Sequence, residues 1–373
     1  MQTKPFRRAG LGLALLLLSV SAFAQDAPPP DASAQKDWRP IGLMRIRDMT
    51  PFGIVRLDLL PAHAVPANPG TFAFEVNVSY QNTYALSENV SRYLEDRGRE
   101  RAPLTRADVQ GILALPGDAY FLDGELGLAD LTLHYRLSNH IGFYGTLPYY
   151  FFDGGFLDGT IESFHENFGF STAGREFVER NQFLILAKIG DTRLLVLDEP
   201  QENEFGDPVF GVRYSLFEKP EKWNLIVEGA AKLALSGDQR LVSSGANDYG
   251  LQATLQRFFG KQALYLSASA VNFRNPDEVF ETIEIVPTVI LGYEFKLTRH
   301  TNGILQFYAS PSVFEDSTVP ELTDEKYLLT LGFQSRRGNT VYRFGITENV
   351  SNFNVTPDIG VTLSVAQILP GRR

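Results

Sequence analysis

The stretch TFAFEVNVSYQNTY, residues 71–84, alternates between apolar and polar side chains. A period of two predicts a β-strand with one apolar and one polar face. The stretch is also longer than the five or six residues that are usual for a strand in a globular protein. The apolar face of this predicted strand carries Phe72, Phe74, Val76, Val78 and Tyr80.

The same alternation recurs along most of the remaining chain. DLTLHYRL (130–137), DPVFGVRYSLF (207–217) and TIEIVPTVILGYEFKL (282–297) each separate an apolar face from a polar one. The pattern predicts about twelve strands, near residues 71–84, 121–137, 140–152, 206–217, 222–235, 248–259, 262–273, 282–297, 303–312, 326–335, 340–349 and 358–369.

The connections between these strands alternate in length. Short turns such as 138–140 and 336–339 alternate with longer loops such as 85–120 and 153–205. Short turns on one rim, long loops on the other and an even number of strands are typical of outer-membrane barrels. We therefore predict an all-β fold, an antiparallel transmembrane β-barrel of about 12 strands with both termini on the periplasmic side. A soluble β-sandwich or a periplasmic barrel is the alternative, because its strands also alternate.

The first residues, 1–24, have the pattern of a secretory signal peptide. Lys4, Arg7 and Arg8 precede a short apolar run, and small residues at the end of that run suit cleavage after Ala24. An exported barrel predicts a location in the outer membrane of a Gram-negative bacterium.

The mature chain divides into three predicted parts. Residues 25–40 are rich in Pro, Ala and Asp and predict a flexible linker. Residues 41–70 contain four Pro and a mixture of apolar and basic residues, and we expect this N-terminal segment to plug or cap the lumen. Residues 71–369 form the predicted barrel.

Charge and cysteine content narrow the function classes. The chain has no Cys, so its stability must come from strand pairing and burial rather than from disulfides. Removing the signal peptide takes away three positive and no negative charges, which moves the formal net charge from −10 to −13. This balance argues against nucleic acid as a partner. We expect outer-membrane lipid and lipopolysaccharide, the outer-membrane assembly machinery and a small solute of unknown identity as partners, and no cofactor.

The polar faces of the predicted strands carry many charged residues. In a barrel these side chains point into the lumen, where they line a solute path or form salt bridges that fill the interior. Twelve strands leave both interpretations open, because eight can be filled by side chains and 16 leave a channel. The candidates are Asp130, His134, Arg136, Arg213, Glu228, Lys232, Glu284, Glu294, Lys296 and Arg343.

The segment GGFLDGTIESFHENFG, residues 154–169, lies in a predicted extracellular loop. Its apolar residues recur at helical spacing, Asp158 suits an N-cap, and Gly169 suits the position that ends a helix. We predict a short helix that folds inward as a lid or constriction, with its glutamates turned to water or to arginines of the rim. The lid residues are Asp158, the predicted N-cap, followed by Ile161, Glu162, Phe164, His165, Glu166, Phe168 and Gly169, the predicted end.

Glu162 and His165 stand three residues apart, as in the Glu-x-x-His pairs of di-iron bundles. Those bundles need a second copy and further glutamates, and the sequence offers no second copy. A packed histidine is therefore favoured over a metal ligand, and we expect no metal.

Three stretches carry a resemblance to a known family. GGFLDGTIESFHENFG with the following Gly174 and Arg175, IRDMTPFGIVRLDLLPAHA (46–64) and LDGELGLADLTLHYRLS (122–138) resemble an uncharacterised proteobacterial family of outer-membrane β-barrels, a domain of unknown function. The resemblance implies a location and an architecture but no mechanism. More loosely, residues 232–251 are similar to a strand-loop-strand piece of barrels thought to import aromatic or fatty compounds.

These observations favour a passive channel or uptake porin for a small solute over two alternatives. The first alternative is a structural or envelope-assembly barrel with a filled lumen. The second is a membrane enzyme that acts on lipids, which needs a Ser activated by a His. His134 and Ser138 lie about 13 Å apart along a strand, too far for that, so we do not expect an enzyme.

Overall fold

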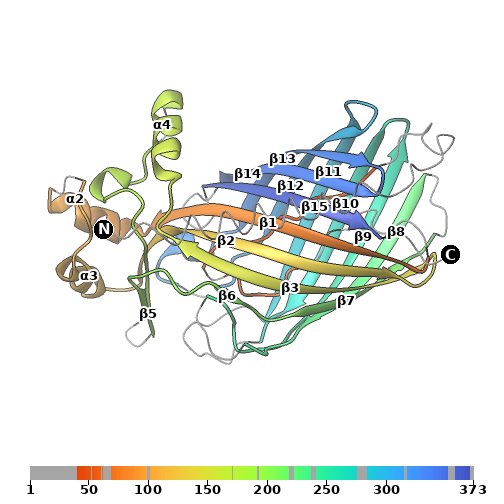
Figure 1. Ribbon diagram of the computed structural model, residues 1–373. Helices are drawn as coiled ribbons and strands as arrows, with labels where there is room; N and C mark the ends of the chain where they lie inside the picture. Colours follow the sequence, from red (N-terminus) through yellow and green to blue (C-terminus); the bar gives the residue numbers. More distant parts are fainter. Residues whose placement is uncertain are drawn as a thin grey trace.

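The structure is a computed structural model of the chain (Figure 1). It describes residues 40–51, 53–59, 61, 69–98, 101–169, 171–190, 193–217, 222–236, 241–274, 284–314, 317–351 and 358–369. The predicted signal peptide, its cleavage site and all but the last residue of the predicted linker lie outside the described residues.

Twelve of the described strands close into one antiparallel barrel, as predicted. The wall runs from the first strand to the last in chain order, and the two ends of the sheet pair with each other, with Ala73 opposite Ile368 and Asn82 opposite Ile359. The wall strands are β1 (Thr71–Leu86), β2 (Ala119–Arg136), β3 (Ile141–Asp153), β7 (Val209–Ser215), β8 (Trp223–Lys232), β9 (Asp248–Phe259), β10 (Gln262–Asn272), β11 (Ile285–Lys296), β12 (Thr301–Ser310), β13 (Lys326–Arg337), β14 (Thr340–Ser351) and β15 (Ile359–Ile368).

The two rims of the barrel differ as predicted. At one rim, here called the turn end, the strands are joined by short connections such as 260–261 and 338–339. At the other rim, the loop end, the connections 87–118 and 154–208 are long and contain structure of their own. Figure 1 shows this extra structure gathered beside the ends of β1, β2 and β3.

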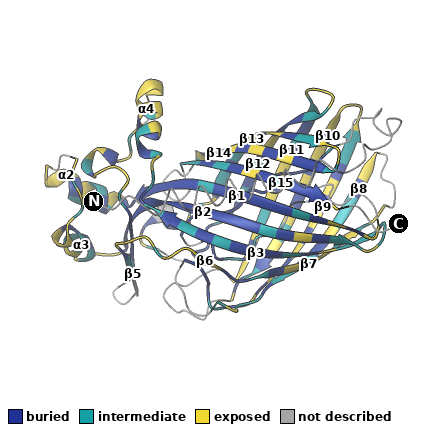
Figure 2. Cartoon of the chain, viewed as in Figure 1, coloured by how far each residue is buried: buried dark blue, intermediate teal, exposed yellow. Residues whose placement is uncertain are grey.

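The wall has an apolar outer face and a polar inner face. Outward side chains such as Leu133, Leu291 and Phe333 are 49%, 49% and 56% exposed, as a lipid-facing surface requires. On the inner face hydroxyl groups pair across neighbouring strands, for example Thr132 with Thr146 at 2.9 Å. Figure 2 shows the alternation as bands of buried and exposed residues along the strands.

A small accessory layer stands at the loop end. The first residues of β2 pair with β4 (Leu184–Ile189), β4 pairs with β5 (Arg193–Leu197), and the short β6 (Glu204–Phe205) pairs with β3. The layer also contains the helices α2 (Glu88–Asp96), α3 (Arg106–Leu113) and α4 (Asp158–Phe168) and a single 3-10 turn, η2 (Arg175–Phe177), while α5 (Pro320–Thr323) lies between β12 and β13.

The helices α2 and α3 form a second apolar core outside the barrel. Leu94 of α2 and Ile112 of α3 are fully buried against Phe121 of β2 and Leu186 of β4. The prediction of a long loop at 85–120 is wrong where α2 and α3 form. Among the described residues, no helix is long and apolar enough to cross a membrane.

Candidate functional site: an occupied lumen

The barrel interior contains the chain's own N-terminal segment. We call the described residues within 40–61 the lumen segment. It starts near the turn end, where the backbone N–H groups of Ile41 and Gly42 donate to the carboxylate of Glu294 at 2.8 and 3.0 Å. One step deeper, Gln306 accepts from the N–H of Met44 at 2.5 Å and donates to its carbonyl at 3.0 Å. Side chains of the inner wall therefore bind backbone groups of the segment that a neighbouring strand would bind in a sheet.

The lumen segment reaches the loop end and then turns back. The N–H of Leu57 donates to Asp248, the first residue of β9, at 2.9 Å. The part of the segment after this turn lies beside the part before it, because Asp58 contacts Arg45 at 3.1 Å. Further down, Arg213 donates to the carbonyl of Pro61 at 3.1 Å. The segment thus spans most of the barrel height twice.

Glycines of the inner wall make room for the apolar side chains of the lumen segment. Leu43 and Met44 are 0% and 1% exposed. A Cβ atom at Gly292 would stand 2.2 Å from Leu43 Cδ2, and one at Gly332 would stand 2.7 Å from Met44 Sδ. Gly345 is equally close to the Met44 side chain, at 2.8 Å from Cε. The wall and the segment are therefore complementary in shape, and the segment belongs to this lumen.

A buried ion pair links the lumen segment to β2. Asp130 is 1% exposed, and its carboxylate lies 2.7 Å from Arg45 and 3.7 Å from Arg47. Two arginines from the segment therefore converge on one acid of the wall. Such a pair is costly to separate, because each charge would be left in a poorly hydrated interior.

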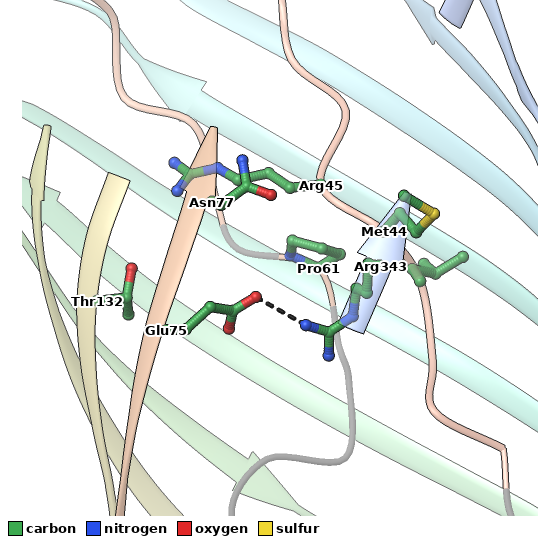
Figure 3. A pocket seen from close by; sticks show the side chains of 8 residues that line it. Met44, Arg45, Pro61, Glu75, Asn77, Thr132 and Arg343 are labelled. Atoms are coloured by element: carbon green, nitrogen blue, oxygen red, sulfur yellow. Dashed lines mark hydrogen bonds and ion pairs between the residues drawn. The ribbon is translucent and has the colours of Figure 1, made fainter. Parts of the chain in front are cut away.

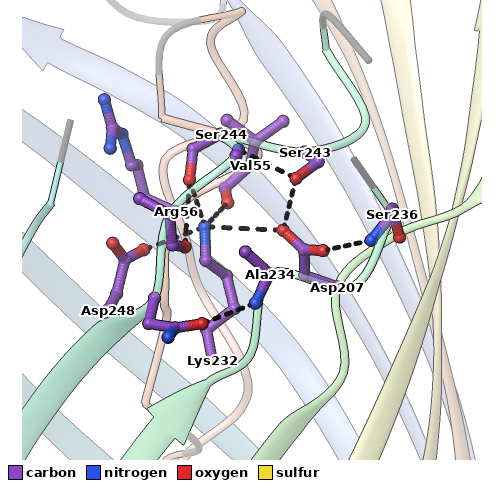
Figure 4. A network of polar contacts seen from close by, with 12 residues as sticks. Val55, Arg56, Asp207, Lys232, Ala234, Ser236, Ser243, Ser244 and Asp248 are labelled. Atoms are coloured by element: carbon purple, nitrogen blue, oxygen red, sulfur yellow. Dashed lines mark hydrogen bonds and ion pairs between the residues drawn. The ribbon is translucent and has the colours of Figure 1, made fainter. Parts of the chain in front are cut away.

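A second charged network lies at the loop end (Figure 4). Lys232, the last residue of β8, is 2% exposed and donates to the carbonyl of Val55 at 2.8 Å. Its ammonium group lies 3.1 Å from Asp248 and 3.8 Å from Asp207. Asp207 in turn accepts from Ser243 at 2.6 Å. This network joins the lumen segment, the wall and the loop after β8.

Two further clusters lie along the inner wall. Glu75 contacts Arg343 at 2.8 Å and His134 at 3.2 Å, and Figure 3 shows the first of these pairs beside Met44 and Arg45. On β8, Glu228 accepts from Tyr144 at 2.7 Å and also pairs with Arg213. These acids are neutralised by wall residues rather than by the lumen segment.

Three of the predicted lumen residues lie away from the centre of the lumen. Arg136 donates to the carbonyls of Ser138 and Asn139 and so closes the turn after β2. Lys296 is half-buried at the last position of β11. Glu284 was predicted to point into the lumen, and this was wrong. It is exposed and precedes β11, because the wall begins only at Ile285.

Some residues that hold the lumen segment were not among the sequence candidates. Gln306 and Gln334 bind its backbone, and Gln334 donates to the carbonyl of Gly42 at 2.6 Å. Asp248 was also missed. All three fall on the polar face of their strands, so the alternation contained the signal, but the two glutamines carry no charge and Asp248 is the first residue of its strand.

Two small cavities lie beside the described part of the lumen segment. The cavity at Glu75 and Arg343 holds about 10 Å³, and a second cavity near Asp58 and Phe273 holds about 50 Å³. A single water needs about 10–15 Å³ on this scale, so the first cavity holds at most one water and the second holds a few. Among the described residues, no group of three or more His, Asp or Glu could hold a metal ion. His134 is paired with Glu75, and Ser138 accepts from the backbone of the turn, so the two do not form a nucleophile and base.

The prediction that α4 folds inward as a lid is wrong. Figure 1 shows α4 standing out from the wall, clear of the barrel mouth. Phe164 and Phe168 are 46% and 67% exposed, whereas Ile161 is buried. Leu157, not Asp158, is the N-cap, while Gly169 ends the helix with a left-handed φ of 73° as predicted.

The physical reason for this outward course is an ionic network at the base of α4. The carboxylate of Asp158 accepts from Arg175 at 2.7 Å and from Asn82 at 3.0 Å. Asn82 shares the outward face of β1 with Tyr80, so the network holds the loop on the outside of the wall. Arg175 also pairs with Asp358.

Glu162 and His165 have different partners. Glu162 accepts two bonds from Arg101 at 2.8 and 2.9 Å and further bonds from Arg180. Burial acts to raise the pKa of the Glu162 carboxyl, and the two guanidinium groups outweigh it, so the pKa lies below its ordinary value. His165 contacts the carbonyl of Ser171 at 2.8 Å, and Glu166 is exposed.

The wall and its contents define a class of protein, an outer-membrane type of twelve-stranded β-barrel whose polar lumen is filled by its own N-terminal segment. The chain belongs to the family described as "Protein of unknown function (DUF3187)", whose model matches residues 105–367. The expected membership of an uncharacterised barrel family is therefore confirmed. Among curated proteins, none matches this sequence.

Several solved structures are similar to this chain. The COG4313 outer membrane channel from Pseudomonas putida F1 is 10% identical, with a TM-score of 0.49, and the match covers 84% of this chain and 100% of that one. The P. putida toluene transporter TodX is 8% identical, with a TM-score of 0.38, covering 83% and 94%. A Pseudomonas aeruginosa FadL homologue is 10% identical, with a TM-score of 0.35, covering 89% and 100%.

Proposed function

We propose that this protein is an outer-membrane channel for a small solute and that the lumen segment keeps it closed. The support is the chemistry of the inner wall. Charged residues lie along the height of the wall, with Glu294 near the turn end, Asp130 and Glu228 midway, and Lys232 and Asp248 at the loop end. Without the lumen segment, these side chains would border a continuous polar path, as they do in selective channels.

The proposal rests mainly on which part of the chain occupies the lumen. Among the described residues, the lumen segment precedes β1 and contributes no strand to the wall. Its backbone is held by side chains such as Glu294, Gln306 and Gln334. The segment can therefore leave the lumen without breaking a strand pair, and its departure is the opening step that we propose.

Deleting residues 40–61 tests the proposal. We expect the deletion variant to give steady conductance in planar bilayers, because the wall is retained while its occupant is gone. Retention of the barrel is checked by its circular dichroism. Glu294→Ala provides a second variant with an intact segment, for which we expect brief openings because two backbone N–H groups lose their acceptor. A folded deletion variant that stays silent would contradict the channel.

A structural barrel with a filled lumen is the second candidate. The fit of Leu43 and Met44 against wall glycines favours it, because such complementarity also stabilises a permanent core. Under this candidate Glu228→Ala lowers thermal stability, since Tyr144 and Arg213 lose their acceptor. The candidate also predicts that the deletion of residues 40–61 unfolds the barrel instead of opening it.

The outer-membrane location is part of the proposal. The apolar outer face of the wall supports it, together with the signal-peptide pattern of residues 1–24. Lipid and lipopolysaccharide would then surround the wall, and the outer-membrane assembly machinery would insert it. Fractionation of cells followed by N-terminal sequencing is expected to find a chain that starts after Ala24 in the outer membrane. Recovery in the soluble periplasm would contradict the location.

A further inference from the structure

We propose that α4 is an interfacial anchor that lies on the outer leaflet of the bilayer, with Phe164 and Phe168 inserted among the lipids. This inference rests on the outer-membrane location proposed above. It goes beyond the proposed channel function, because it assigns a lipid-binding role to α4, a helix that lies outside the lumen.

An aromatic patch on the outer wall marks the level of the membrane boundary. Tyr80 precedes the polar Asn82 on the outward face of β1, and the next residues of that face, Tyr84 and Leu86, are covered by the apolar core that contains α2. Its ring stacks on Phe151 of β3 at 6.0 Å and on Phe156 of the following loop at 5.6 Å. Phe156 is 58% exposed. Aromatic girdles of this kind lie at the lipid–water interface of barrels.

The next outward-facing residue of β1 already lies outside the hydrocarbon core of the bilayer. Asn82 follows Tyr80 on the same face and bonds Glu125, Asp158 and Arg175. A network with this much charge is not placed against lipid tails. The boundary therefore falls between Tyr80 and Asn82, and α4 starts within this boundary at Asp158.

The rotation of α4 about its own axis is fixed by its polar side. Glu162 is clamped by Arg101 and Arg180 from the neighbouring loops. Phe164 and Phe168 lie on the other side of the helix, with ring centroids 4.7 Å apart, and remain exposed. Figure 1 shows α4 projecting sideways from the wall, and Figure 2 shows its far end exposed. A helix with one aromatic and one charged side, lying across the barrel axis, has the form of an interfacial helix.

Continuity with the lipid-facing wall selects lipid as the occupant. The chain passes from the exposed Phe156, which stacks on the outer wall, directly into α4. The helix α4 therefore starts at the edge of the lipid-facing surface. Burying two phenylalanine rings in the leaflet removes apolar area from water, which is favourable.

The test uses the absence of cysteine in the chain. Three single variants, Phe168→Cys, Ser163→Cys and Leu291→Cys, each receive a fluorescent label and are reconstituted in vesicles of phosphatidylethanolamine and phosphatidylglycerol. Ser163 lies on the polar side of α4 and is exposed, so it is the matched control. Leu291 lies on the outward face of β11 and is 49% exposed, so it reports insertion of the barrel itself. Quenching by a lipid with a nitroxide near its headgroup is compared with quenching by iodide in the water.

We expect the labels at positions 168 and 291 to lose most of their fluorescence to the nitroxide lipid, and the label at 163 to lose it to iodide. If position 291 is quenched by lipid but position 168 responds only to iodide, the anchor is overturned and the barrel location stands. If position 168 responds to neither quencher, a protein partner or a second copy covers α4, which also overturns the anchor. If position 291 is not quenched by lipid, the outer-membrane location fails.

Discussion

Glycines on the inner wall decide whether the lumen segment fits. The side chain of Leu43 occupies the space that a Cβ atom would need at Gly292, and Met44 does the same at Gly332 and Gly345. Elsewhere on the inner wall a glycine has room to spare. At Gly142 the nearest atom to such a Cβ would be a backbone oxygen at 3.6 Å. The two kinds of position permit a controlled comparison.

The first residue-scale prediction concerns Gly292→Ala. The added methyl group overpacks the lumen against Leu43, and we expect a loss of about 1–3 kcal/mol in the free energy of unfolding. Thermal unfolding in detergent micelles measures this loss. Gly142→Ala is the matched control and is expected to change little. Adding Leu43→Ala to Gly292→Ala should recover part of the loss, and the absence of any recovery would contradict the proposed contact.

A second residue-scale prediction concerns Asp130→Ala. The change leaves Arg45 and Arg47 without their wall acid, although Arg45 keeps Asp58. Breaking a buried pair costs about 3–5 kcal/mol. Urea unfolding in micelles should show a loss of this order. Glu284→Ala, at an exposed position, is expected to stay within about 0.5 kcal/mol of the unchanged protein. Equal effects of the two changes would argue against a buried pair.

At the scale of elements, α4 is attached to the barrel through side chains rather than through an apolar core. Its first residue is held by Arg175 and its polar side by Arg101 and Arg180, while the apolar side carries the exposed rings of Phe164 and Phe168. The pKa of Glu162 lies below its ordinary value. The ion pair therefore stabilises the attached state above the ordinary glutamate pKa of about 4.3, and the contribution is lost as pH falls through the lowered value.

This gives a prediction for the pH dependence of α4. Hydrogen exchange of the α4 amides should stay slow from neutral pH down to about pH 4.3 and then show an extra acceleration, after correction for intrinsic exchange rates. In Glu162→Gln the extra acceleration should be absent, and exchange should be faster throughout. Glu166→Gln is the control, because Glu166 is exposed. An unchanged profile in Glu162→Gln would show that the pair does not hold the helix.

The elements differ in how well the sequence predicts them. The twelve wall strands were predicted because their alternation is local and can be counted along the chain. The helices α2 and α3 were missed, although Thr105 and Asp108 form a capping box that starts α3 and could be recognised in the sequence. Residues 85–120 had instead been predicted as a long loop between two strands. The inward course of α4 was wrong because Arg175 and Asp158, which set its direction, come together only in the folded loop.

At the scale of the whole molecule, the sequence predicted the wall better than its contents. The polar faces located most of the charged lumen residues, but their partners could not be named. Ile41 and Glu294 are 253 residues apart in sequence, and Gln334 and Gly42 are 292 apart. Such contacts depend on the register of every strand between them. Uncharged wall side chains such as Gln306 also bind the lumen segment, and a prediction restricted to charged positions leaves them out.

The central claim is that the lumen segment must leave the barrel before a solute can pass. The absence of native cysteine permits a direct test with Leu43→Cys and Gly292→Cys in one chain, because Leu43 and the Cβ position of residue 292 are in contact. Oxidation would then tie the segment to the wall, and the two single variants are the controls.

Conductance in planar bilayers is the deciding measurement. We predict openings under applied voltage for the reduced double variant, their disappearance on oxidation, and their return on reduction, while the single variants conduct under both conditions. Equal conductance of the oxidised and reduced double variant would contradict the claim that the segment leaves the lumen.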